Sequence, residues 1–159
     1  MAKFDEVIEN CLVCLNMTES DGHRVVTTLI ERAVAQGLLP KVHKDEAIKA
    51  VMNREMSAST AMPDGIALPH GRTDCVTEIV CMIGIHPKGV DFGAPDNLPS
   101  HIFVLLLVPA TVGCNHIHFL ANLSRRLMEP SVRNELMGAQ TREQILRAIL
   151  NCSDEGLVS

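Results

Sequence analysis

Apolar residues recur at helical spacing over residues 21–36, which predicts a helix with one buried face. These residues are Val25, Val26, Leu29, Ile30, Ala33 and Val34. Ser20 or Asp21 suits the N-cap, and Gly37 suits a left-handed stop after the last turn. Residues 45–55 predict a second helix. Its inward positions are Ala47, Ile48, Val51 and Met52.

The middle of the chain changes to short apolar runs that predict strands. The runs are residues 66–68, 78–85 and 101–108, and the last, HIFVLLLV, lacks alternation. A run without alternation is typical of a strand that is buried on both faces. Clusters of Pro, Gly, Asp and Asn at residues 62–65, 87–89 and 94–97 predict turns between these strands.

The last third of the chain returns to helical spacing. Phe119, Leu120, Leu123 and Leu127 share one face, and Pro130 breaks that helix or opens the next. Thr141 with Gln144 fits a capping box ahead of a final apolar segment. Helices at both ends around central strands predict one α/β sandwich domain over residues 1–159, with no internal repeat or linker.

Composition narrows the class of protein. The 159 residues are 47% hydrophobic and 21% charged, which is ordinary globular usage. The net charge of −5 argues against a nucleic-acid partner. The longest apolar run, residues 102–110, is far shorter than the about 20 residues that span a bilayer. The acidic N-terminus lacks an apolar signal core, so we expect a cytoplasmic protein without membrane insertion.

Six cysteines, scattered through the chain, predict reduced thiols rather than a disulfide framework. Cys11 and Cys14 form a CxxC, which raises the alternatives of redox chemistry or half a zinc site. No second matching pair completes a zinc site, and the apolar neighbours of the two cysteines favour a buried core segment.

The segment GIALPHGR, residues 65–72, carries the most unusual local chemistry. A short apolar run meets Pro69, which stiffens the backbone ahead of His70. Gly71 removes side-chain bulk, so we expect another molecule to approach there. A neutral imidazole offers a lone pair near physiological pH, which makes His70 a candidate nucleophile.

Phosphoryl transfer needs mainly positioning and charge stabilisation, and suitable groups lie near His70 in sequence. Arg54 ends the second predicted helix, and Arg72 follows His70 by two residues. Ser59 and Thr60 offer donors in the connecting loop. His116 stands at the expected start of a later helix, where backbone N–H groups favour anions.

Other interpretations of the same residues stay open. A single histidine among seven is more often a surface or packed residue than a catalyst. Cys114, His116 and His118 could bind a metal, although alternate residues at a helix start do not share a face. Arg54 could be a solvated charge that the helix dipole favours. The residues alone therefore predict a reactive histidine that handles phosphate, and nothing finer.

The chain resembles the enzyme IIA domain of the bacterial sugar phosphotransferase system, mannitol/fructose class, which includes a nitrogen-related regulatory branch. The resemblance rests on three ordered blocks. They are REMSASTAMPDGIALPHGR at residues 54–72, GVDFGAPD at residues 89–96 with the HIFVLLLVPA run after it, and residues 115–116 with FLANLSRRL at residues 119–127. It extends from about residue 20 to residue 150.

This resemblance implies a central mixed β-sheet flanked by helices. It also implies that His70 is the phosphorylated histidine, with His116 and Arg54 beside it. The implied donor is the phosphocarrier HPr, the implied acceptor is a cysteine of an enzyme IIB, and no metal, nucleotide or other cofactor is needed.

The loop before His70 is the main departure from the family pattern, since it lacks the usual run of glycines. It reads AMPDG over residues 61–65, which can still form a tight turn. Two functions follow as alternatives. The chain is either a sugar-uptake component that passes phosphate to an enzyme IIB, or a regulatory protein whose phosphorylation state controls binding to a target.

Overall fold

A computed structural model describes residues 4–111 and 116–151. Within these residues, six strands form one mixed sheet in the order β1-β5-β6-β3-β2, and β4 pairs with the free end of β6. The strands are β1 (Leu12–Cys14), β2 (Ala61–Met62), β3 (Ile66–Ala67), β4 (His70–Thr73), β5 (Val80–Val90) and β6 (Ser100–Pro109). The expected mixed sheet is confirmed, because β5 and β6 are antiparallel whereas β3 and β4 run parallel to β6.

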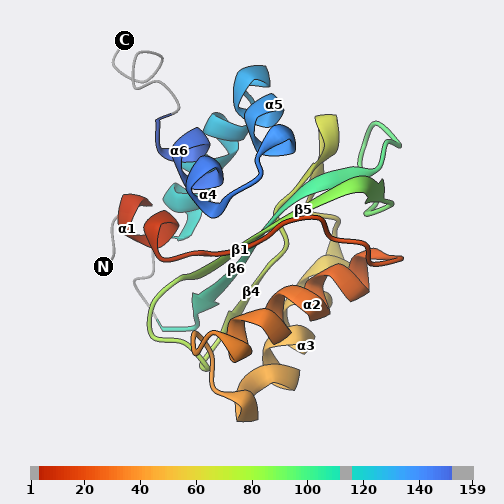
Figure 1. Cartoon of the computed structure of the whole chain (residues 1–159). Helices are drawn as coiled ribbons and strands as arrows, with labels where there is room; N and C mark the ends of the chain where they lie inside the picture. The colour runs from red at the N-terminus through yellow and green to blue at the C-terminus, as the bar shows by residue number, and fades with distance from the viewer. Residues whose placement is uncertain (1–3, 112–115, 152–159) are drawn as a thin grey trace.

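Helices cover both faces of this sheet (Figure 1). One face carries α2 (Gly22–Ala35) and α3 (Lys44–Ser57), and the short 3-10 helix η1 (Lys41–His43) leads into α3. The other face carries α1 (Phe4–Glu9), α4 (His116–Leu127), α5 (Pro130–Gly138) and α6 (Arg142–Leu150). A second 3-10 helix, η2 (Pro63–Gly65), joins β2 to β3. The expected α/β sandwich is therefore confirmed.

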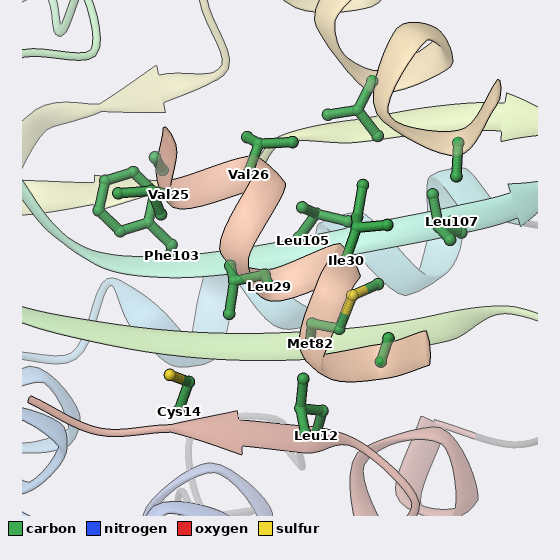
Figure 2. Packing of buried hydrophobic residues seen from close by; sticks show 14 of the residues in the cluster. Leu12, Cys14, Val25, Val26, Leu29, Ile30, Met82, Phe103, Leu105 and Leu107 are labelled. Atoms are coloured by element: carbon green, nitrogen blue, oxygen red, sulfur yellow. The ribbon is translucent and has the colours of Figure 1, made fainter. Parts of the chain in front are cut away.

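Strand β6 supplies both halves of the core, as its apolar sequence predicts. Phe103, Leu105 and Leu107 pack on the α2 and α3 side, and their neighbours Val104 and Leu106 pack on the α4 to α6 side. Figure 2 shows the part of the core on the α2 and α3 side, where side chains of α2 lie over the sheet. Because β6 is buried on both faces, it lies at the centre of the sheet. Strand β4, which begins at His70, is held in place by pairing with it.

The CxxC segment begins with Cys11, directly before β1, and ends with Cys14 in β1, at the edge of the sheet beside β5. Cys14 packs in the core on the α2 side, whereas Cys11 packs in the core on the opposite side. The two thiols thus belong to different layers, and both are free. The interpretation of this segment as buried core is confirmed.

One expected turn is wrong. Residues 87–89 lie inside β5, which continues to Val90 and pairs there with Ser100 of β6. The pairing is irregular between Ile85 and Val90, and Gly89 has a φ of 80°. The Gly89 N–H donates to Nδ1 of His86 over 2.9 Å. The Pro and Gly residues therefore form a bulge within a strand rather than its end.

Asp21 is the N-cap of α2. Its Oδ1 accepts a hydrogen bond from the Arg24 N–H over 2.9 Å. We expect Asp21→Ala to lower the free energy of unfolding by about 1 kcal/mol, because an N–H of the first turn loses its acceptor. Chemical denaturation of the two proteins would measure the loss. Asp21→Asn keeps an acceptor oxygen and should retain most of the stability, so an equal loss in both variants would contradict the capping role.

Candidate active site

His70 is the first residue of β4, directly after the break that separates β3 from β4 along β6. Strand β3 pairs with β6 at Ile102 and Phe103, and β4 resumes the pairing at His70 opposite Leu106. Between them, the Leu68 N–H donates to the Thr60 carbonyl over 3.2 Å, and the Leu106 N–H donates to the Pro69 carbonyl over 3.0 Å. These bonds hold the backbone on both sides of the interruption, so His70 leaves a rigid support, as the proline predicts.

A main-chain carbonyl orients the His70 ring. Nδ1 lies 2.9 Å from the carbonyl oxygen of Leu68. A carbonyl oxygen only accepts hydrogen bonds, so Nδ1 carries the proton in this contact. In the neutral ring the lone pair then lies on Nε2. The half-buried imidazole is therefore fixed in the tautomer whose lone pair lies on Nε2.

The surroundings of His70 favour its neutral form. Burial is the largest cause that lowers the pKa of His70 below 6.5, and the charges of Arg54 and His116 lower it further. The Leu68 carbonyl and the Glu55 carboxylate act in the opposite direction, without reversing the shift. A neutral ring keeps its lone pair, so His70 retains this lone pair at pH values where a free histidine is partly protonated.

We expect His70 to titrate with a midpoint below pH 6.5, because its pKa is lowered. The neutral ring should persist as the pH falls through 6.5, and the charged ring should appear only at lower pH. Imidazole proton and nitrogen shifts in NMR spectra recorded across the pH range would measure this midpoint. A His70→Gln spectrum assigns the signal among the seven histidines. A midpoint at or above 6.5 would contradict the interpretation.

Arg54 and His116 come to the site from different helices. Arg54 lies in the last turn of α3, and its Nη1 donates to the Ala58 carbonyl over 3.0 Å. His116 is the first residue of α4, and its Nδ1 is buried without a hydrogen-bond partner among the described residues. Both act on the pKa of His70 through their charges. The structure thus brings together the three residues that the sequence analysis singled out as central.

Ser59 and Thr60 brace the loop before His70. Ser59 Oγ donates to the Phe92 carbonyl over 2.7 Å and accepts from the Ala61 N–H over 3.1 Å. Thr60 Oγ1 and its N–H both donate to the carboxylate of Glu55, over 2.5 Å and 2.9 Å. Their hydroxyl groups are therefore committed to holding the loop that supports Leu68.

Sequence reasoning missed Glu55, the acceptor of both Thr60 bonds. A signal was available, since a carboxylate in the last turn of a helix opposes the helix dipole and calls for a specific partner. Here that partner is the loop after the helix, which Glu55 joins to the end of α3.

Gly71 and Arg72 do not lie where the sequence suggests. Gly71 is buried, and a Cβ there would lie 2.8 Å from backbone atoms of Ala50 and Val51 in α3. The missing bulk makes room for α3, so the expectation that another molecule approaches at Gly71 is wrong. Arg72 is exposed, and its Nη2 donates to the Ala110 carbonyl over 3.4 Å. It is not among the groups that shift the pKa of His70.

The alternative metal site of Cys114, His116 and His118 falls partly outside the description, because Cys114 is not among the described residues. His118 is exposed on the first turn of α4.

As for membrane insertion, none of the helices in the described parts of the chain has the length and hydropathy to cross a bilayer.

Residues 6–152 match the family described as phosphoenolpyruvate-dependent sugar phosphotransferase system, EIIA 2. The chain belongs to this family, whose members are phosphotransfer components. It is 31% identical over 134 residues to the fructose-specific EIIA component of the phosphotransferase system of Haloferax volcanii, covering 84% of this chain and 86% of that protein. It is 30% identical over 129 residues to the nitrogen regulatory protein of Escherichia coli, covering 79% of this chain and 76% of that protein.

Solved structures agree on the fold. The nitrogen regulatory protein IIA-Ntr of Neisseria meningitidis superposes with a TM-score of 0.80 at 22% identity, covering 91% of this chain and 97% of that one. The mannitol enzyme IIA of Escherichia coli, solved in a complex with phosphorylated enzyme IIB, gives a TM-score of 0.72 at 21% identity, covering 89% and 94%. The expected family and its fold are therefore confirmed, and both functional branches are among the similar proteins.

Proposed function

We propose that this chain is a phosphohistidine carrier that accepts a phosphoryl group on Nε2 of His70 and passes it to a partner protein. One observation carries the proposal: Nδ1 of His70 is held by the Leu68 carbonyl, which leaves the lone pair on Nε2. The lowered pKa of His70 supports it, because the neutral ring is the nucleophile. Membership of a phosphotransfer family supplies the reaction class.

The transfer is a displacement at phosphorus. The Nε2 lone pair attacks the phosphorus of a phosphohistidine on an HPr-like donor. A new P–N bond forms, the donor's P–N bond breaks, and the donor nitrogen keeps that electron pair. The Nδ1 proton of His70 stays on its ring and keeps its bond to the Leu68 carbonyl. In the next step a cysteine thiolate of an enzyme IIB attacks the same phosphorus, and His70 recovers its lone pair.

The neighbouring groups take separate roles in this proposal. Arg54 and His116 stabilise the negative charge of the phosphoryl group as it arrives. Ser59 and Thr60 fix the loop before His70 through their hydrogen bonds, and Gly71 allows β4 to pack closely against α3. Arg72 donates a hydrogen bond to the Ala110 carbonyl on the surface. None of these steps requires a metal or another cofactor.

A regulatory role is the second candidate, favoured by the identity with the nitrogen regulatory protein of E. coli. In that role the same phosphohistidine alters the affinity for a target protein, and transfer to an enzyme IIB is not the output. Both candidates place this single domain in the cytoplasm, and neither involves nucleic acid.

The carrier function can be tested by intact mass after incubation with phosphoenolpyruvate, enzyme I and HPr. We expect one added phosphoryl group, labile to acid, which disappears when an enzyme IIB of the fructose or mannitol class is added. Labelling without loss to any enzyme IIB would favour the regulatory candidate. No labelling, while an authentic enzyme IIA is labelled in the same tube, would overturn the carrier function.

Arg54→Ala is expected to slow phosphoryl acceptance by about 100-fold, because a positioned cation that stabilises the transferring group is lost. Single-turnover transfer from phosphorylated HPr would measure the rate. Arg72→Ala is the matched control, since it removes an exposed arginine that does not act on His70. Equal slowing in the two variants would mean that general positive charge, and not Arg54, assists the transfer.

A further inference from the structure

A second group of chemically reactive side chains lies at the start of α3. His43 is the last residue of η1, Glu46 lies in the first turn of α3, and Cys75 lies in the turn after β4. One ligand atom from each of the three residues lies within 4.8 Å of the other two. This set, the His43–Glu46–Cys75 cluster, plays no part in the proposed transfer.

The fold brings Cys75 to the two helical residues. Strand β4 packs along α3, because Gly71 allows contact with the backbone of Ala50 and Val51. After Thr73 the chain turns, and the Cys75 N–H donates to Thr73 Oγ1 over 3.1 Å. That turn brings Cys75 to the beginning of α3, where its Sγ lies within 4.8 Å of a carboxylate oxygen of Glu46.

The spacing of the cluster is close to that of a metal site. Nδ1 of His43 lies 3.9 Å from Oε2 of Glu46. Tetrahedral zinc with ordinary Zn–N and Zn–O bonds would place such atoms about 3.4 Å apart, so this pair needs to approach by only about 0.5 Å. All three side chains are accessible in part, and Cys75 lines a surface pocket with Leu38 and Glu78, which gives an ion a path to the sulfur.

We propose that the His43–Glu46–Cys75 cluster binds one Zn²⁺ through Nδ1, a carboxylate oxygen and Sγ, with water in the fourth position. Imidazole, carboxylate and thiolate together are the ligand types that zinc prefers. Binding releases the proton of the Cys75 thiol, because the thiolate is the form that binds a metal. The thiolate and the carboxylate then balance the charge of the ion, and the Asp74 carboxylate lies close by.

This site is separate from His70. Glu46 and Arg54 lie eight residues apart on α3, which corresponds to about 12 Å along a helix. An ion here would join the start of α3 to the turn after β4, and so strengthen the contact between α3 and the strand that carries His70. It would not occupy the nucleophile.

The test titrates the full chain, stripped with a chelator, with Zn²⁺ in one sample and with Co²⁺ in another. We expect one Zn²⁺ per chain, and a thiolate-to-metal charge-transfer band in the sample that binds Co²⁺. Cys75→Ser should abolish the band, and His43→Gln should weaken Zn²⁺ binding by about tenfold or more. Circular dichroism verifies that both variants are folded.

Cys114→Ser and His118→Ala are the matched controls, because they remove the alternative ligands near His116. Both should bind Zn²⁺ as the unchanged chain does. Loss of binding in the controls with retention in Cys75→Ser would overturn the proposal in favour of the other residues. Absence of stoichiometric Zn²⁺ in the unchanged chain would overturn it outright. Neither result depends on whether His70 is phosphorylated.

Discussion

Replacing His70 by alanine is expected to reduce phosphoryl acceptance by on the order of a thousandfold or more, to background, because no other group in the proposed mechanism replaces the nucleophile. Intact mass after incubation with phosphoenolpyruvate, enzyme I and HPr would show no added phosphoryl group. Among the described residues, the half-buried ring makes no hydrogen bond besides that to the Leu68 carbonyl, so the variant should fold.

His118→Ala is the control for this experiment, since it removes an exposed histidine from α4 and leaves His70, Arg54 and His116 in place. It should be labelled at the rate of the unchanged chain. Phosphate on the His70→Ala protein would contradict the assignment. Peptide mapping of that product would then show whether His116 is the nucleophile.

Gly71→Ala is expected to lower the free energy of unfolding by about 3 kcal/mol, since the added methyl group meets backbone atoms of α3. For a domain of this size that corresponds to a fall in Tm of roughly 10 °C. Backbone atoms cannot rotate away as a side chain does, so α3 must shift from β4. The shift carries Arg54 away from His70, and transfer should slow even where the variant is folded.

Gly138→Ala tests the same chemical change where, among the described residues and apart from its own helix, no atom lies within 4 Å of the new methyl group. Its Tm should stay within the error of the unchanged chain or rise slightly, because alanine has fewer unfolded conformations than glycine. If both variants lost stability equally, the close approach of α3 at Gly71 would not be the cause.

Much of the fold could be predicted because its elements carry strong local signals. The apolar run of β6 indicates burial on both faces, and the spacing from Val25 to Ala33 indicates the inner face of α2. Thr141 accepts from the Gln144 N–H as the capping box predicts, and Pro130 begins α5. Each signal is a local preference that the tertiary structure keeps.

The errors occur where tertiary contacts override local preference. Pro87 and Gly89 predict a turn, yet the hydrogen bond to His86 and the pairing at Val90 hold them within β5. Strand β4 was not predicted, since residues 70–73 have no apolar alternation and pair only because β6 lies beside them. Gly71 shows the same difficulty, because the backbone atoms beside it belong to α3, which lies about twenty residues earlier in the sequence.

At the site, the sequence singled out candidate residues and missed the hydrogen bonds that position them. His70, Arg54 and His116 stand out by residue type and by the resemblance, and the structure places them in one electrostatic group. The bond from Nδ1 to the Leu68 carbonyl and the brace from Glu55 to Thr60 depend on backbone geometry that no pattern of residue types encodes. The roles in transfer stay predictions until labelling is measured.

The acceptor that fixes the His70 tautomer has a consequence for how such a chain can diverge. It is a peptide oxygen, and any amino acid at position 68 supplies one. Point mutation therefore cannot delete it, whereas an acceptor on a side chain would be lost in a single codon change. The surface around His70 can therefore change by mutation while the orientation of the imidazole ring is kept.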